Sequence, residues 1–327
     1  MARLMCRAGA QSPCGMASAD LKAYGGIDVE GRQIQRMIDQ MSPPIQRWVD
    51  AQPEPQKQPP VPKMYVSYDA TGVPMRSEEL QGRPGKQEDG SSKTREAKLG
   101  CVFTQHDVDE EGYALRDESS TSYIASFESS DEFGTQMRQE VIRRGMAYAT
   151  EILVIGDGAP WIWEVARVNF PKATQILDFY HAMEHLTSLS SALYGEKTPQ
   201  ALRVFEKWKT MIKNDQLSAV IKKARKKLPR HGSRRMEAQK QIAYFQKNTS
   251  RMTYATFRKK GLFIGSGVIE AGCKTVIGKR LKQSGMLWST SGARNVLSLR
   301  CALYSNRFDS FWNQRNTSPP SELALAS

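Results

Sequence analysis

The chain has 327 residues, of which 39% are hydrophobic and 25% are charged, and its formal net charge is +13. This composition predicts a folded protein of one or two domains, and it excludes an intrinsically disordered chain. No run of about 18 uncharged apolar residues predicts a membrane span, and the N-terminus lacks the apolar core of a secretory signal. Five scattered cysteines without a Cys-x-x-Cys pair fit neither a disulfide framework nor a zinc ribbon, so we expect a reducing, cytoplasmic compartment.

The first 62 residues divide into three segments. Residues 1–19 show no periodic pattern and are predicted to be a disordered lead. Residues 20–50 are predicted to be helical, because Ile34, Ile38 and Met41 recur at helical spacing. This segment resembles part of a helix-turn-helix DNA-binding unit. Five prolines over residues 51–62 then predict a stiff linker.

The pattern changes at residue 63 to short β-prone stretches and amphipathic helices, which continue to residue 196. Strands are predicted at 63–70, 99–105, 122–127, 152–155 and 175–179, and helices at 131–149, 161–168 and 181–193. Strands followed by alternating strands and helices predict an α/β layer fold. Residues 63–196 are therefore expected to form the first part of a catalytic core.

Residues 197–260 carry the whole excess of positive charge. This segment has 19 basic and 3 acidic residues, a net charge of +16, while the rest of the chain carries −3. It is rich in helix formers, and its aromatic residues recur at the spacing expected of a helical core. We therefore predict an all-helical basic insertion, and so complete a segregation of charge favours contact with nucleic acid over an ordinary solvated surface.

The core is predicted to resume over residues 261–310 with its final helices, before a disordered tail at 311–327. A helix is expected from Ser266 or Gly267 to about Gln283. On a helical wheel, Glu270 falls inside the apolar arc of this helix, where a carboxylate is costly to bury unless it binds a ligand. The alternative is a first-turn glutamate that interacts favourably with the helix dipole.

Three carboxylates are the candidate catalytic groups. Asp69 and Asp157 each follow a predicted strand, and strands of one α/β sheet deliver such residues to a common edge. Taken singly, each is better explained as an ordinary turn residue. Together with Glu270 they suit Mg²⁺, which prefers hard oxygen ligands, and two such ions stabilise the attacking and leaving oxygens of phosphoryl transfer.

Several motifs resemble those of the Kra-type bacterial insertion-sequence transposases. They are the stretches 68–74 (YDATGVP), 82–87 (GRPGKQ), 156–159 (GDGA) and 265–289, and the resemblance extends from about residue 20 to about residue 310. It implies a DDE transposase with a ribonuclease H-like mixed sheet flanked by helices, whose metal-binding triad is Asp69, Asp157 and Glu270. The stretch from Asp178 to His181 is similar to the Asp/Cys-x-x-His motif of the hAT and Mutator families, which implies a role for His181 at the scissile strand. The match begins near Ala19, inside the region where related transposases carry DNA-binding helices, which predicts a shortened start.

The resemblance also implies cofactors and partners. We expect two Mg²⁺ ions, with Mn²⁺ as a possible substitute, and DNA as the partner, both as element terminal repeats and as target DNA. The enzyme is expected to act as a homo-oligomer on DNA, in the cytoplasm and associated with the bacterial nucleoid, with no membrane partner. Eleven basic residues are the candidate DNA contacts: Arg83, Lys86, Arg95, Lys222, Lys223, Arg225, Lys226, Lys227, Lys274, Arg280 and Lys282.

Two other functions remain open from the sequence. The first is a DNA-binding transposase remnant that has lost full transposition activity. The second is a zinc metalloprotease, because His181, Glu184 and His185 form a His-x-x-Glu-His pattern. That short pattern occurs by chance, needs a third ligand, and leaves the three carboxylates and the basic segment unexplained.

Overall fold

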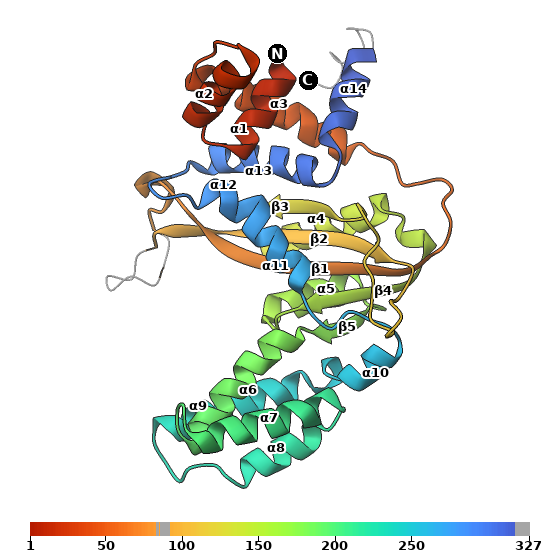
Figure 1. Cartoon of the computed structure of the whole chain (residues 1–327), viewed down its shortest axis with the longest axis vertical. Coiled ribbons are helices and arrows are strands. Elements are labelled where there is room, and N and C mark those ends of the chain that lie inside the picture. The colour runs from red at the N-terminus through yellow and green to blue at the C-terminus, as the bar shows by residue number, and fades with distance from the viewer. Residues whose placement is uncertain (83–84, 86–91, 318–327) are drawn as a thin grey trace.

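A computed structural model describes residues 1–82, 85 and 92–317 of the chain (Figure 1). Its centre is one five-stranded sheet with the order β3-β2-β1-β4-β5. The strands are β1 (Val61–Pro74), β2 (Thr94–Gln105), β3 (Ser122–Ser126), β4 (Ala149–Gly156) and β5 (Thr174–Leu177). All five lie where the sequence predicts strands, and β1 and β2 are longer than predicted.

The sheet has a ribonuclease H-like topology. Strands β1, β2 and β3 form an antiparallel meander, and β4 and β5 pair in parallel on the other side of β1. Strand β1 is therefore central, and Met64, Val66 and Tyr68 on one of its faces are buried. A central strand covered on both faces needs apolar residues in both directions, as β1 and β2 have. The predicted fold class is confirmed.

Helices cover both faces of the sheet. On one face lie α4 (Ser130–Arg143) and α5 (Pro160–Asn169), and the Tyr68 ring packs there against Phe133 and Trp161. On the other lie α11 (Gly267–Gly272) and α13 (Thr290–Tyr304) (Figure 1). Helix α11 approaches closely because Gly272 has no side chain: a Cβ there would lie 2.6 Å from the Tyr123 ring.

The N-terminal segment differs from the prediction. Residues 1–19 are not disordered: they form α1 (Ala2–Gln11) and the first half of α2 (Cys14–Gly25). Both pack with α3 (Gly31–Asp50), in which Ile34, Ile38 and Met41 are buried as predicted. Sequence periodicity missed α1 because its buried side of Met5, Cys6, Gly9 and Ala10 consists largely of small residues. The apolar side of α3 packs against α13.

Two buried arginines join α1 to the helices that follow α11. Arg280 donates to the carbonyl oxygen of Gly9, and Arg300 donates to that of Ala10. These carbonyls belong to the last turn of α1, where a helix lacks internal partners and attracts cations. Arg300 also donates to the carbonyls of Thr275 and Val276, so the helix that follows Glu270 and α1 share one buried cation.

The basic insertion forms a helical arm beyond β5. The arm consists of α6 (Phe179–Tyr194), α7 (Pro199–Lys213), α8 (Leu217–Arg225), α9 (Ser233–Lys247) and the short α10 (Tyr254–Lys259). It leaves the sheet on the side opposite α1 and α13 (Figure 1). Trp208, Phe245 and Tyr254 are buried inside it, so these aromatics form its core as predicted. The arm also includes α6, which begins before the predicted boundary at residue 197.

The end of the described chain also differs from the prediction. Helix α14 (Phe308–Thr317) extends into the segment 311–327 that was expected to be disordered. Phe311 and Trp312 are buried, and the Phe311 ring packs edge-on against Trp48 of α3. Burial of these two large aromatic side chains accounts for the order of the helix. None of the helices in the described residues is long and apolar enough to cross a membrane.

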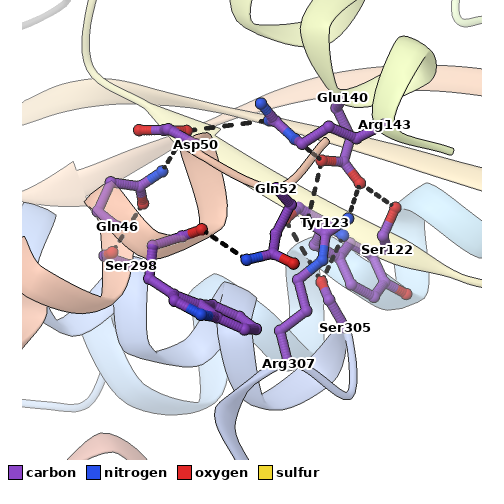
Figure 2. Close-up of polar contacts among 11 residues, drawn as sticks. Gln46, Asp50, Gln52, Ser122, Tyr123, Glu140, Arg143, Ser298, Ser305 and Arg307 are labelled. Carbon is purple, nitrogen blue, oxygen red and sulfur yellow. Dashed lines mark hydrogen bonds and ion pairs between the residues drawn. The ribbon is translucent and has the colours of Figure 1, made fainter. Parts of the chain in front are cut away.

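A buried carboxylate holds the edge strand β3 to the surrounding helices (Figure 2). Glu140 of α4 has a fully buried side chain that accepts hydrogen bonds from Ser122 of β3 and from Arg143. Arg307, which follows α13, donates to both carboxylate oxygens of Glu140 at 2.9 and 2.7 Å. A buried charge is tolerated when it is paired and hydrogen-bonded in this way, so this network joins the sheet edge to both helical layers.

Candidate active site

Asp69 and Asp157 lie at matching positions on neighbouring strands. The parallel register of β1 and β4 pairs Val66 with Val154 and Ser67 with Ile155. Continuing this register by two residues places Asp69 beside Asp157, at the carboxyl end of β4. Adjacent strands are about 4.8 Å apart, so the two carboxylates lie side by side at the carboxyl end of β4, as the sequence predicted.

The electrostatics of Asp69 depend on burial and on both of the other carboxylates. Burial raises the pKa of the Asp69 carboxyl above its ordinary value of 3.8, and the negative charges of Asp157 and Glu270 raise this pKa further. Hydrogen bonds from the backbone N–H of Ala70 and the thiol of Cys273 partly offset this increase in the pKa of Asp69. No ion pair in the described part of the chain involves any of the three carboxylates, so their mutual repulsion is unrelieved by a cation.

Glu270 lies on α11, the short helix that packs against β1 and β2. Its side chain is exposed, which corrects the expectation that it lies in a buried apolar arc. The wheel assumed 3.6 residues per turn throughout, but residues 273–278 form a π-helical turn that rotates every later residue. The predicted long helix therefore consists of three short pieces: α11, the π-helical turn and α12 (Lys279–Leu281).

A short chain of hydrogen bonds orients Glu270. The hydroxyl of Ser266 donates to Glu270 Oε1 at 2.8 Å. The backbone N–H of Ser266 in turn donates to the carboxylate of Asp178, whose side chain is almost completely buried. Asp178 also accepts from the backbone N–H of His181 and so caps α6. One buried aspartate thereby fixes both the start of the arm and the start of the Glu270 helix.

The donor set fits Mg²⁺ better than zinc. Among the residues that the structure describes, no three histidine, cysteine or acidic side chains are placed to hold one metal ion, and this includes Asp69, Asp157 and Glu270 taken together. Zinc sites in proteins need three or four such ligands. Mg²⁺ is commonly held by one or two carboxylates, with waters and substrate phosphates as the other ligands. Asp69 and Asp157 supply two such carboxylates side by side on neighbouring strands.

His181 lies at the start of α6 and contacts only its own helix through its ring. Its Nδ1 is 3.4 Å from Glu184 Oε2, and its ring lies edge-on to that of His185. The Nδ1 of His185 is 2.6 Å from the side-chain oxygen of Gln241, and burial lowers the pKa of His185. Within the described residues the His-x-x-Glu-His pattern has no third ligand, and the structure gives the zinc-protease alternative no support.

Seven of the eleven predicted DNA contacts are exposed in the structure. Lys282 is exposed and hydrogen-bonds to Thr71, two residues after Asp69, so it lies beside the carboxylates. Lys274 is also exposed, on the helix that follows Glu270. The five basic residues at 222–227 are all exposed, because α8 buries Leu217, Val220, Ile221 and Ala224 on its other side.

Two predicted contacts are corrected, and two are not described. Arg280 is buried, donates to Gly9 and lies over the ring of Trp288, so it is a core residue that phosphate does not reach. Arg95 is half-buried and donates to the side chain of Thr290 and the carbonyl of Phe127, so it joins β2 to α13. Arg83 and Lys86 lie outside the described residues.

Sequence reasoning missed three residues of this site. Asp178 and Ser266 orient Glu270, and Cys273 donates its thiol proton to Asp69. The sequence does indicate a capping role for Asp178, because this residue comes just before a predicted helix, as an N-cap residue does. Ser266 was identified only as a possible cap, yet its hydroxyl bonds to Glu270 and not to the backbone. No pattern in the chain pairs Cys273 with Asp69, which are 204 residues apart.

Comparison with known proteins gives structural likenesses and one family. The solved structure of the Drosophila P element transposase strand transfer complex is similar at a TM-score of 0.33 and 8% identity, over 96% of this chain and 80% of that chain. At this TM-score, residues of the two proteins cannot be equated. None of the curated proteins matches the chain. A family model matches residues 84–310, more than half of the chain, and the protein therefore belongs to the uncharacterised protein family UPF0236.

Proposed function

We propose that this protein is a transposase that cuts DNA at the ends of an insertion sequence and joins the freed ends to target DNA. The observation that carries the proposal is the sheet edge shared by Asp69 and Asp157, with Glu270 near enough for its charge to raise the pKa of Asp69. The Kra-type resemblance implies the same three residues as a catalytic triad. Carboxylates gathered on a ribonuclease H-like sheet suit metal-dependent phosphoryl transfer.

Each carboxylate has a separate role in this proposal. Asp69 and Asp157 hold the divalent ions, and Glu270, oriented by Ser266, completes the coordination of one of them. When bound, two Mg²⁺ ions, or Mn²⁺ in their place, stabilise the attacking and leaving oxygens of an in-line displacement. Water attacks first at the element end, and the freed 3′-hydroxyl then attacks target DNA without a covalent enzyme intermediate. Lys282 and Lys274 contact phosphates beside this edge, and His181 contacts the scissile strand.

The basic arm supplies most of the affinity for DNA. Its exposed residues include Lys222, Lys223, Arg225, Lys226 and Lys227 on one side of α8. Release of counterions from DNA phosphates makes such a surface bind without reading sequence. The arm begins directly after β5, whose last residue Leu177 pairs with Gly156 next to Asp157, so DNA bound along the arm extends toward the carboxylates. Assembly of several copies on the DNA is part of the proposal.

The test is strand cleavage by the full chain on a DNA fragment that carries both ends of the insertion sequence, taken from the DNA flanking its gene. Wild-type protein with Mg²⁺ is expected to nick at the element ends. Asp157→Asn is expected to lower the nicking rate at least about a hundredfold, a typical loss when one transition-state contact is removed. The exposed Asp20 of α2 provides the control, because Asp20→Asn is expected to cleave normally. Equal rates for wild type and Asp157→Asn would refute the assignment.

Two other results would identify the alternatives. Tight DNA binding without cleavage in either Mg²⁺ or Mn²⁺ would mark the chain as a DNA-binding remnant. Stoichiometric zinc in the purified protein, together with peptide hydrolysis that His185→Ala abolishes, would favour the metalloprotease. Both results can be obtained with the same preparation used for the cleavage test.

A further inference from the structure

A tyrosine side chain of the basic arm contacts the turn that follows Asp157. The hydroxyl of Tyr244, on α9, donates to the main-chain carbonyl oxygen of Asp157 at 3.0 Å. Strand β4 ends at Gly156, so the peptide group that follows Asp157 lies beyond the strand. The carboxylate of Asp157 meanwhile accepts from the N–H of Ala159 at 2.8 Å. Tyr244 therefore helps to fix the turn that sets the direction of the Asp157 carboxylate.

The tyrosine is itself held in place by α6 and α9. Its ring stacks on the imidazole of His185, with centroids 3.5 Å apart and planes at 19°. The Nδ1 of His185 is 2.6 Å from Gln241 Oε1, and the Gln241 amide donates to Glu237. A stacked ring whose neighbour is fixed in this way loses little further freedom when its hydroxyl bonds to Asp157.

The turn after Asp157 is shaped to receive the tyrosine. Gly158 has a φ of +100°, a conformation that side-chain-bearing residues rarely adopt. A Cβ on Gly158 would lie 2.7 Å from the Tyr244 hydroxyl oxygen and 2.9 Å from the ring. Glycine at this position therefore serves both the backbone conformation and the close approach of the arm.

From these contacts we infer that Tyr244 is a positioning residue through which the arm controls the affinity of Asp157 for a divalent cation. The inference rests on the proposed function, because it assumes that Asp157 is a metal ligand. Residues that orient metal ligands commonly change metal affinity by 10- to 100-fold when they are removed. Movement of α9 when DNA binds the arm would reach the Asp157 turn through this hydrogen bond.

The test compares Tyr244→Phe with Tyr194→Phe in the full-length protein. Both changes remove one hydroxyl from the arm, but Tyr194 lies against Trp208, with no hydrogen bond from its hydroxyl among the described residues. Binding of Mn²⁺ without DNA is measured by electron paramagnetic resonance of the free ion, and the Mg²⁺ concentration for half-maximal nicking is measured separately. Tyr244→Phe is expected to weaken Mn²⁺ binding about tenfold and to regain nicking at saturating Mg²⁺. Tyr194→Phe is expected to behave as wild type.

The outcomes separate this inference from the proposed function. Unchanged Mn²⁺ binding in Tyr244→Phe, or an equal loss in Tyr194→Phe, would overturn the role of Tyr244 while leaving the nuclease proposal intact. A wild-type protein that binds Mn²⁺ but never nicks DNA would reject the nuclease, and the comparison of Mn²⁺ affinities would still decide the role of Tyr244. A wild-type protein that binds no Mn²⁺ would overturn both. Thermal unfolding without metal checks that both variants remain folded.

Discussion

At the scale of single residues, the candidate site depends on contacts made by neutral or buried groups around the carboxylates. Ser266 orients Glu270, Cys273 donates to Asp69, and Asp178 fixes the backbone of Ser266. Ser266 and Cys273 act directly on carboxylates of the site, whereas Asp178 acts on Glu270 only through the backbone of Ser266. Such arrangements favour a bound cation over the stability of the metal-free fold.

Ser266→Ala tests this view of Glu270. The change removes the hydroxyl that donates to Glu270 Oε1 but keeps the backbone N–H that Asp178 accepts. We expect the Mg²⁺ concentration for half-maximal nicking to rise about tenfold, because Glu270 loses its fixed direction.

Ser289→Ala is the matched control for this variant. The Ser289 hydroxyl accepts from the N–H of Gly292 and caps α13, without a contact to the three carboxylates. Its loss is expected to lower the free energy of unfolding by about 1 kcal/mol without changing the Mg²⁺ dependence. A similar Mg²⁺ dependence for both variants would contradict the role given to Ser266.

At the scale of secondary-structure elements, buried ion pairs and cations decide how the helices attach to the sheet. Burial alone would raise the pKa of Glu140, but hydrogen bonds and charge from Arg307, aided by Ser122 and Arg143, outweigh it and lower the pKa below 4.5 (Figure 2). Arg300 attaches α1 in a similar way, by donating to the carbonyl oxygen of Ala10 in the last turn of that helix. These charges are placed by tertiary contacts between segments that are distant in the sequence.

Glu140→Ala is expected to lower the free energy of unfolding by about 3 to 5 kcal/mol, because it leaves Arg143 and Arg307 buried without their partner. The effect has a defined pH dependence. The pKa of Glu140 is lower in the folded than in the unfolded chain, so its stabilisation is complete above the unfolded pKa and disappears as the pH falls through the folded pKa. Denaturant unfolding of both proteins between pH 7 and pH 3 measures this difference.

Glu164→Ala provides the comparison for Glu140→Ala. Glu164 is exposed on α5 and pairs with Arg167 at 2.5 Å, so it makes an ion pair of the same kind without burial. Exposed pairs contribute little to stability, and we expect an almost unchanged unfolding midpoint. Equal losses for the two variants would show that burial of Glu140 is not the cause.

At the scale of the whole molecule, charge and shape are divided between two bodies. The core contains the acidic residues of the candidate site, and residues 197–260 of the arm carry a net charge of +16. The arm follows β5, whose last residue Leu177 pairs with Gly156, the residue before Asp157, so the start of the arm lies next to the carboxylates. The +13 of the whole chain is therefore a local property of the arm.

Replacing the five basic residues of the 222–227 block by glutamine tests the arm as the main DNA-binding surface. These side chains are exposed, so the fold is expected to remain intact. If each contacts one phosphate, the slope of log affinity against log salt should fall in magnitude by about 4. Fluorescence anisotropy with duplex DNA at several salt concentrations measures the slope.

The control for this variant is Lys57→Gln combined with Lys172→Gln. Both lysines are exposed outside the arm, in the linker before β1 and between α5 and β5. This pair is expected to change the salt slope by less than one. A salt slope that is unaffected by the loss of all five arm charges would place the DNA-binding surface elsewhere.

The sequence by itself determined the strands, most helices and the positions of the three carboxylates. These follow from local rules: alternating apolar residues specify β1, a continuous apolar run specifies β4, and segregated charge marks the arm. The resemblance of the motifs then grouped Asp69, Asp157 and Glu270. Short-range pattern was sufficient because each strand signal lies within one element and the charge excess lies within one continuous segment.

Only the tertiary structure decided how these elements meet. It buried Arg280 against α1, exposed Glu270 through a π-helical turn, and brought Tyr244 to the Asp157 turn. It also ordered residues 1–19, whose helices are stabilised by packing on α3 and α13. The physical reason is that burial and hydrogen bonding between distant segments contribute more than local propensity, and contacts of that range leave no periodic signal in the chain.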